Sequence, residues 1–186
     1  MPFEALLISA GIVAIAEIGD KTQLLSLVLA TRFKRPWPVV AGIFAATLLN
    51  HAAAGAVGAW LMQAIGPDRM RWILAIGFIA MAGWALIPDR FEEKDEKLRA
   101  GSVFWTTAFL FFLVEMGDKT QLATVALAAR FDSLWQVVTG TTIGMLVANA
   151  PVIWLGESIM KRVPLKVVRI VAALLFVAMG VAVFFA

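Results

Sequence analysis

Glu17-Ile-Gly-Asp-Lys-Thr-Gln-Leu24 recurs 98 residues later in the chain as Glu115-Met-Gly-Asp-Lys-Thr-Gln-Leu122. Both copies lie in the middle of apolar stretches that are long enough to cross a bilayer as helices. Each copy carries two acids and one lysine, so six ionisable side chains are expected at membrane depth. At roughly 2.5 to 3.5 kcal/mol per charge, six unpaired charges would cost on the order of 15 to 20 kcal/mol. A cost of this size indicates a functional site.

The composition predicts an all-α integral membrane protein. Hydrophobic residues make up 61% of the 186, and the mean hydropathy is +0.87, which is above the range of soluble domains. Apolar runs near or above the roughly 20 residues of a membrane helix predict six transmembrane helices. These runs cover residues 3–31, 39–63, 70–88, 102–129, 136–158 and 165–186. They do not alternate apolar and polar residues as the strands of a membrane barrel do.

Several other functions are disfavoured by the same composition. The chain has no cysteine, which excludes disulfides and thiolate metal sites. The net charge is +3, but the basic residues are confined to short loops, so they indicate a membrane surface rather than a nucleic-acid partner. The first residues, Met-Pro-Phe-Glu, lack the basic region of a secretory signal, and the first apolar run is therefore expected to be a permanent helix.

The two halves of the chain align without a gap when 98 is added to the residue number. Each half contains three predicted helices, and an odd number makes the second half enter the membrane from the opposite side. The sequence thus predicts an inverted repeat, with one three-helix half at residues 1–88, a charged linker at 89–100 and a second half at 101–186. Eleven Lys and Arg residues follow the first, third and fifth helices and three lie on the other side, so both termini are predicted to be non-cytoplasmic.

The motif acids are the predicted metal ligands. Glu17 and Asp20 are three residues apart, so both would lie on the same side of a helix, and Glu115 and Asp118 repeat this spacing. Four carboxylates meeting at the midplane would suit a hard divalent cation such as Ca²⁺, Mn²⁺ or Mg²⁺. Neutral oxygen ligands that could complete the shell are Thr22, Gln23, Asn50, Thr120, Gln121 and Asn149.

Lys21 and Lys119 tune the charge of this site, and two arrangements are open. In an unbroken helix Lys21 would pair with Glu17, and the charges would only hold helices together. A break at Gly19 or its counterpart Gly117 would instead turn backbone carbonyls toward the site and let the lysines point elsewhere. With both lysines charged, four carboxylates and two ammonium groups sum to −2, which one divalent cation or two protons would neutralise.

This charge balance predicts a mechanism. Crowded carboxylates in a low-dielectric site do not all stay ionised without a cation, so protons and metal ions exclude each other. Exposing such a site alternately to the two sides of the membrane gives metal/proton antiport. The same acids could line a passive cation channel, but a compact cluster in two inverted units favours a carrier.

Three further features are open to more than one interpretation. His51, the only histidine, is a ligand, a proton relay or a local hydrogen-bonding group, and its repeat counterpart is Asn149. Glu157 is either interfacial or part of an entry path. The acids of residues 89–99 belong to a solvated connector or gather cations at the cytoplasmic mouth. The Gly- and Ala-rich residues 41–59 are expected to make close helix contacts or sliding surfaces.

The two motifs resemble the signature of a known family, the cation/proton exchangers that include bacterial MneA-type manganese exporters and the Golgi transmembrane protein 165. That family is marked by two copies of E-x-G-D-[KR]-[TS] in inverted three-helix halves. Residues 17–22 and 115–120 match it at every fixed position, and the resemblance covers the whole chain. It implies export of Mn²⁺, and in some relatives Ca²⁺, from the cytoplasm against protons, with the motif acids as the cation site.

The resemblance and the shortness of the chain together suggest a multi-pass protein of a bacterial inner (plasma) membrane. The expected partners are the lipid bilayer, divalent metal ions and protons, with no cofactor beyond the transported ions, no nucleic acid and an open oligomeric state. The alternatives are a Ca²⁺/H⁺ antiporter of the same fold, a passive divalent-cation channel and a noncatalytic scaffold. An intramembrane hydrolase is disfavoured because no nucleophile or histidine cluster accompanies the acids, so the protein is not expected to be an enzyme.

Overall fold

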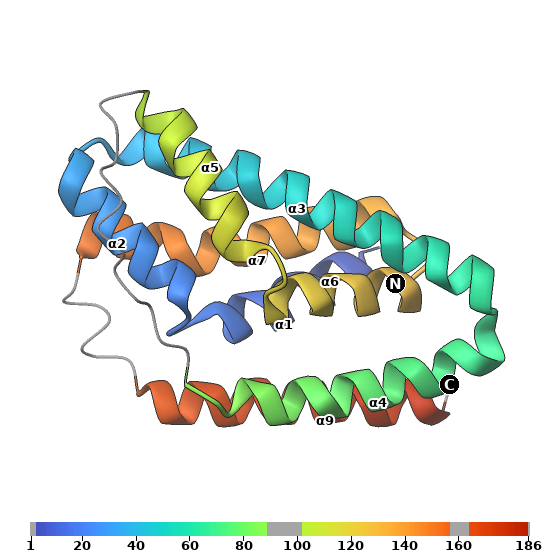
Figure 1. The fold of residues 1–186 in the computed structure, drawn as a ribbon. Helices are drawn as coiled ribbons and strands as arrows, with labels where there is room; N and C mark the ends of the chain where they lie inside the picture. Colours follow the sequence, from blue (N-terminus) through green and yellow to red (C-terminus); the bar gives the residue numbers. More distant parts are fainter. Residues whose placement is uncertain (1–2, 89–101, 157–163, 186) are drawn as a thin grey trace.

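The structure, a computed structural model, describes residues 3–88, 102–156 and 164–185, and within them every regular element is an α-helix (Figure 1). The helices are α1 (Glu4–Glu17), α2 (Lys21–Phe33), α3 (Pro36–Ile65), α4 (Pro67–Ala85), α5 (Val103–Glu115), α6 (Lys119–Arg130), α7 (Leu134–Leu155) and α9 (Leu165–Phe185). Outside the described residues lie the whole charged linker at 89–100, Glu157, Lys161 and Arg162. The all-helical class predicted from composition is confirmed for the described part of the chain.

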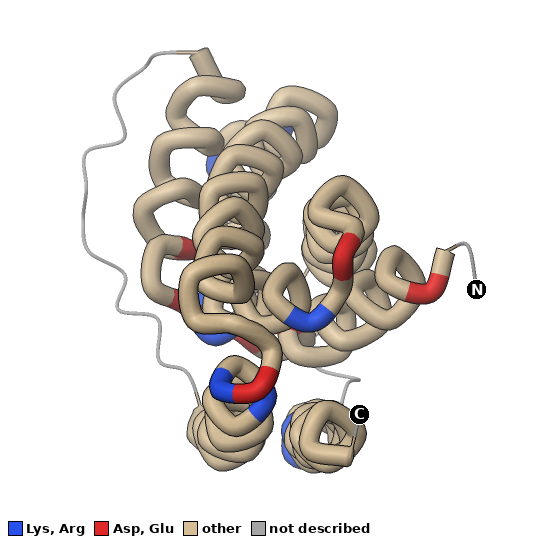
Figure 2. Tube along the Cα trace, turned by 90° about the vertical axis from the view of Figure 1, so that its right-hand side faces the viewer, with Lys and Arg blue, Asp and Glu red and all other residues tan. Residues whose placement is uncertain are grey.

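Among the helices of the described residues, three are long and apolar enough to cross a membrane by length and composition, namely α3, α7 and α9, with 30, 22 and 21 residues. α5 is apolar but shorter. The first and fourth apolar runs, each expected as one helix, are divided in two at the motif, into α1 and α2 and into α5 and α6. Long stretches of the bundle carry no charged residue, as the uncoloured lengths of helix in Figure 2 show.

A tight turn causes the break between α1 and α2. The N–H of Asp20 donates to the carbonyl of Glu17 at 3.1 Å, which closes a four-residue turn. Ile18 has φ −64° and ψ 119°, and Gly19 has φ +81°. These angles are those of a type II turn, which requires a residue with positive φ at its third position, and glycine occupies it without strain. The expected break at Gly19 is therefore confirmed. The positive φ of the turn explains why glycine occupies the third position of E-x-G-D.

The second copy folds in the same way. Asp118 N–H donates to the Glu115 carbonyl at 3.1 Å, Met116 has φ −65° and ψ 119°, and Gly117 has φ +77°. In each turn the glycine N–H donates to the glutamine four residues later, at 2.8 Å to Gln23 Oε1 and at 2.7 Å to Gln121 Oε1. The motif therefore encodes a turn together with the polar group that caps it.

The helices pack mainly across the two halves of the sequence. α1 lies along α7, α5 and α6 lie along α3, and α4 lies along α9. Glycines permit the close approach: a Cβ on Gly140 would meet the Leu6 carbonyl of α1, and one on Gly58 would meet the Val125 carbonyl of α6. A Cβ on Gly55 would overlap the Leu134 side chain of α7 and would also touch α6. The close helix contacts expected for residues 41–59 are thus confirmed.

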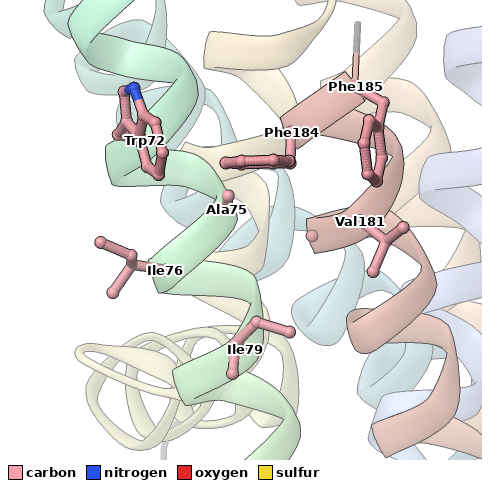
Figure 3. A pocket seen from close by; sticks show the side chains of 8 residues that line it. Trp72, Ala75, Ile76, Ile79, Val181, Phe184 and Phe185 are labelled. Atoms are coloured by element: carbon pink, nitrogen blue, oxygen red, sulfur yellow. The ribbon is translucent and has the colours of Figure 1, made fainter.

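Much of the outer surface along the helices is apolar, with exposed side chains such as Leu7, Phe109 and Leu174. Between α4 and α9 there is a hollow of about 300 Å³ that is lined only by apolar and aromatic side chains, among them Trp72, Ile76, Ile79 and Phe184 (Figure 3). Hydrocarbon solvates such a surface well, whereas water does not. This face therefore agrees with a bundle that is surrounded by lipid.

Candidate metal-binding site

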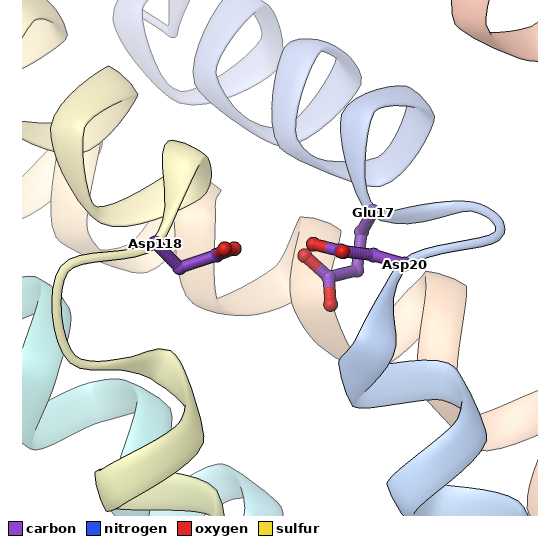
Figure 4. Close-up of side chains that lie close together, drawn as sticks. All are labelled: Glu17, Asp20 and Asp118. Carbon is purple, nitrogen blue, oxygen red and sulfur yellow. The ribbon is translucent and has the colours of Figure 1, made fainter. Parts of the chain in front are cut away.

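Three of the four predicted carboxylates form one buried cluster. Glu17 is the last residue of α1, Asp20 caps α2, and Asp118 precedes α6. One carboxylate oxygen from each lies within 4.8 Å of the others, and the three residues are 0%, 1% and 1% exposed. Figure 4 shows the carboxylates pointing toward one another from the two motif turns. Each type II turn places its aspartate at the start of a helix, directly opposite the other turn.

The motif lysines pair across the two copies. Lys21 Nζ lies 3.0 Å from Asp118 Oδ1, and Lys119 Nζ lies 3.7 Å from Asp20 Oδ1. Each lysine therefore faces the aspartate of the opposite copy instead of the glutamate four residues before it. Neutralisation of the cluster is thus shared between the halves, which answers the question of where the lysines point once the helix is broken.

Glu17 differs from the two aspartates. Within the described residues, neither of its carboxylate oxygens accepts a hydrogen bond, although the side chain is fully buried. Asn149 lies near the Glu17 carboxylate. Its amide is engaged elsewhere, because its Nδ2 donates to the Met145 carbonyl and its Oδ1 accepts from Ser26 at 2.8 Å. A buried carboxylate without donors is costly unless a cation or a proton compensates it. Glu17 is therefore the acid best placed to receive one.

Glu115, the fourth predicted ligand, lies beside the cluster with partners of its own. Thr47 Oγ1 donates to its Oε1 at 3.0 Å, and Asn50 Nδ2 donates to its Oε2 at 3.0 Å. Both partners come from α3, which packs against α5. His51 Nε2 lies 3.6 Å from the same Oε1. The two motif glutamates thus occupy equivalent positions in the turns but have different surroundings.

The predicted neutral ligands have several roles in the structure. Thr120 Oγ1 donates to Asp118 Oδ2 at 3.3 Å, and the buried Thr22 hydroxyl has no hydrogen-bond partner among the described residues. Gln23 and Gln121 cap the turns, and Gln23 Nε2 also donates to the Ala148 carbonyl of α7 at 2.7 Å. Asn50 donates to the Glu115 carboxylate, as described above. In this arrangement the two threonine hydroxyls are the neutral groups best suited to act as metal ligands.

Two contributing residues escaped the sequence reasoning. Thr47 supports Glu115, and Ser26 fixes Asn149. Each had a usable signal: Thr47 lies one helical turn before Asn50, and Ser26 lies one turn after Gln23. A buried hydroxyl at that spacing from a predicted polar ligand is a reasonable candidate for its partner.

Hard oxygen ligands in this number suit a divalent cation. Carboxylate, hydroxyl and amide oxygens are the groups that Mg²⁺, Ca²⁺ and Mn²⁺ prefer. The ends of four helices meet at the cluster, since α1 and α5 end and α2 and α6 begin at the two turns. Broken helices whose ends converge on buried charges, within a bundle of apolar helices, are features of ion carriers. The fold and the site are thus typical of a membrane protein of the carrier class.

Comparison with known proteins identifies the family. The family described as "Divalent cation/proton antiporter GDT1" matches residues 5–93 and 103–186, and the chain belongs to this family. It is 47% identical over 178 residues to a "Putative manganese exporter" of Vibrio cholerae. The matched segment covers 95% of this chain and 88% of that protein. A GDT1-like protein of Synechocystis is 26% identical and covers 89% of each chain. No solved structure matches.

Proposed function

We propose that this protein is a secondary transporter that exports a divalent cation, most readily Mn²⁺, from the cytoplasm in exchange for protons. The observation that carries the proposal is the buried cluster of Glu17, Asp20 and Asp118, with ligand oxygens from both motif copies within 4.8 Å. Membership of a family of divalent cation/proton antiporters supports the exchange reaction. The name of the Vibrio relative supports manganese as the substrate.

In this mechanism, metal ions, protons and lysines compete for the same acids. The two motifs bring together four carboxylates and two ammonium groups, a net charge of −2, if Glu115 is counted with the cluster. A divalent cation at Asp118 displaces Lys21 from its 3.0 Å contact, and protonation of the carboxylates removes the attraction for the cation. Binding of one ion thereby promotes release of the other, and one divalent ion exchanges for two protons when both lysines stay charged.

The proposal includes the predicted topology of two inverted halves, residues 1–88 and 101–186, joined by a cytoplasmic linker at 89–100. α1, α2, α5 and α6 have 12 to 14 residues, about 20 Å each, so none bridges a hydrocarbon core of about 30 Å alone. In the proposal each broken pair crosses as one span, and α4 crosses beside α3, α7 and α9, which gives six spans. α1 begins and α9 ends toward the same end of the bundle, which supports two termini on one side of the membrane, the non-cytoplasmic side in this proposal (Figure 1). The membrane is a bacterial inner membrane.

Flux measurements in liposomes test the proposal. Purified protein is reconstituted, a pH gradient is imposed, and Mn²⁺ and proton movements are followed together. We expect Mn²⁺ to move in the direction opposite to the protons. We expect Glu17→Gln, Asp20→Asn and Asp118→Asn each to abolish this exchange. Asp132→Asn is the matched control, because Asp132 is exposed and outside the cluster, and it should transport normally.

The other outcomes identify the alternatives. Retained transport in any two of the cluster variants would overturn the cation site. Ca²⁺ flux that Mn²⁺ fails to inhibit would make calcium the substrate. Mn²⁺ flux without counter-movement of protons would indicate a passive channel.

A further inference from the structure

We infer that Glu115 and His51 form a second cation position, next to the three-carboxylate cluster, that selects first-row transition metals over Ca²⁺. The inference rests on the proposed function, because it concerns the same transported ion. Asp118 links the two positions: it belongs to the cluster and also lies within electrostatic range of both His51 and Glu115. The two positions are therefore neighbours in the same buried region.

The state of His51 is the first argument. The side chain is completely buried in the middle of α3, and neither ring nitrogen has a hydrogen-bond partner within the described part of the chain. Buried polar groups in folded proteins are nearly always paired, since an unpaired one costs about 1 to 3 kcal/mol. A buried imidazole with no such partner, beside a carboxylate, therefore calls for a ligand that supplies the missing interaction.

The geometry of the pair is the second argument. His51 Nε2 and Glu115 Oε1 are 3.6 Å apart, longer than a normal hydrogen bond. Two ligands about 2.0 to 2.3 Å from one metal ion, at about 90° to 110°, lie about 3 to 4 Å apart. The hydroxyl of Thr47 is 3.0 Å from the same oxygen and faces it from the preceding turn of α3. Imidazole, carboxylate and hydroxyl thus converge from two helices.

The chemistry of the nitrogen ligand gives the selectivity. Ca²⁺ takes shells made entirely of oxygen ligands, whereas first-row transition metals also accept an imidazole nitrogen, Mn²⁺ more weakly than the later metals of the row. A mixed nitrogen and oxygen position therefore gains free energy with Mn²⁺ that it does not gain with Ca²⁺. The three-carboxylate cluster has no such preference, because all of its ligands are hard oxygens.

The repeat shows that only one half carries this position. His51 aligns with Asn149 and Thr47 aligns with Met145 when 98 is added. Asn149 and Met145 satisfy each other, because Asn149 Nδ2 lies 3.0 Å from Met145 Sδ and 3.0 Å from its carbonyl oxygen. The imidazole beside Glu115 is therefore a departure from the internal symmetry, as expected of a residue that adds specificity.

The single histidine makes a direct test possible without mutation. Protein without a histidine tag is produced once with ordinary histidine and once with ¹⁵N-histidine, placed in lipid nanodiscs and given one equivalent of Mn²⁺. Pulsed electron paramagnetic resonance then reports nitrogen nuclei bound to the ion. We expect a ¹⁴N coupling that becomes a ¹⁵N coupling on labelling. Bound Mn²⁺ without any coupling to histidine nitrogen overturns the inference.

A flux comparison tests selectivity separately. His51→Asn places in α3 the residue that α7 has at the equivalent position. We expect the ratio of Mn²⁺ to Ca²⁺ transport to fall by about tenfold or more, as metal affinity does when a ligand shell is damaged, while Ca²⁺ transport persists. An unchanged ratio overturns the inference and leaves the proposed function intact. Failure of the wild-type protein to exchange any divalent cation for protons would instead overturn the proposed function.

Discussion

Lys21 Nζ lies 3.0 Å from Asp118 Oδ1, so the lysine of the first motif neutralises an acid of the second. Lys119 and Asp20 make the reciprocal pair at 3.7 Å. The two copies therefore depend on each other for charge compensation. In one half alone the buried aspartate would lack its lysine partner, and burying its unpaired charge would cost free energy. The same contacts link the turns that hold the three carboxylates together.

Lys21→Met should destabilise the protein in the absence of metal and increase its stabilisation by Mn²⁺. Removing one partner of a buried pair costs about 3 to 5 kcal/mol, and the partial exposure of Lys21, at 27%, makes a smaller loss the expectation. The motif groups then carry −3 instead of −2, which favours a divalent cation more strongly. Thermal unfolding in detergent with and without Mn²⁺ measures both effects.

Lys166→Met is the control for that experiment, because Lys166 is exposed at the start of α9. It should leave both the melting temperature and the metal response unchanged. A Lys21 variant with the wild-type response to Mn²⁺ would mean that this lysine and the metal ion do not compete.

Gly117→Ala should impair transport through the backbone alone. The residue has φ +77°, where a Cβ costs roughly 1 to 2 kcal/mol, yet the space around it is open. The turn would shift and move Asp118 away from Glu17 and Asp20, so we expect at least a tenfold loss of Mn²⁺ flux. Gly117→Asn should lose less, because asparagine tolerates positive φ.

Gly83→Ala provides the comparison, since Gly83 is inside α4 and also has open space around it. In a helix this change is neutral or stabilising by up to about 1 kcal/mol. Equal flux in the Gly83 and Gly117 variants would show that the type II turn does not position the site.

Much of the site could be predicted from the sequence because it depends on local rules. Glycine at the third position of each motif marked the point where the helix breaks. Glu17 and Asp20 do lie close together, but the type II turn brings them there, and the predicted placement on one side of a continuous helix was wrong. The lysine partners could not be predicted, because Lys21 is close to Glu17 along the chain and only the fold brings Asp118 nearer. Local spacing cannot decide between a contact along one helix and one across the bundle.

The separate environment of Glu115 was also hidden, although the repeat contained a sign of it. Equivalent motifs suggested four equivalent acids, but the helices that support them differ. Thr47 and Asn50 surround Glu115, whereas the aligned positions are Met145 and Ala148. Comparing the supporting helices residue by residue, and not only the motifs, would have revealed the difference.

The two capping glutamines should have unequal effects. Gln23 accepts from Gly19 and donates to the Ala148 carbonyl, while Gln121 makes the one corresponding bond to Gly117 within the described residues. At about 1 kcal/mol per hydrogen bond, Gln23→Met should cost about twice as much stability as Gln121→Met. Denaturant or thermal unfolding of the two variants, side by side, measures the difference.

The same pair of variants tests whether these side chains bind the ion. If Gln121 only caps its turn, Gln121→Met should leave Mn²⁺ affinity nearly unchanged once the protein is folded. A large loss of affinity with little loss of stability would make Gln121 a metal ligand, as the sequence alone had suggested.

Gly140→Ala should weaken the contact between α1 and α7. The added Cβ would meet the backbone carbonyl of Leu6, which has no freedom to rotate away, so the helices must separate. We expect a loss of about 1 to 3 kcal/mol, seen as a lower melting temperature. Gly77→Ala is the matched change in a helix position with open space, and an equal effect there would argue against a helix contact at Gly140.

The packing of α1 on α7, and of α5 on α3, has a consequence for how the chain is built. Most of the interface lies between the sequence halves, so a single half would expose the glycine-lined faces that its partner covers. Two polypeptides made by cutting the chain between residues 89 and 101 should consequently find each other and reassemble. Under the proposed alternating-access mechanism, we therefore expect the moving bodies to be composites, α1 with α7 and α3 with α5 and α6, rather than the N-terminal and C-terminal halves.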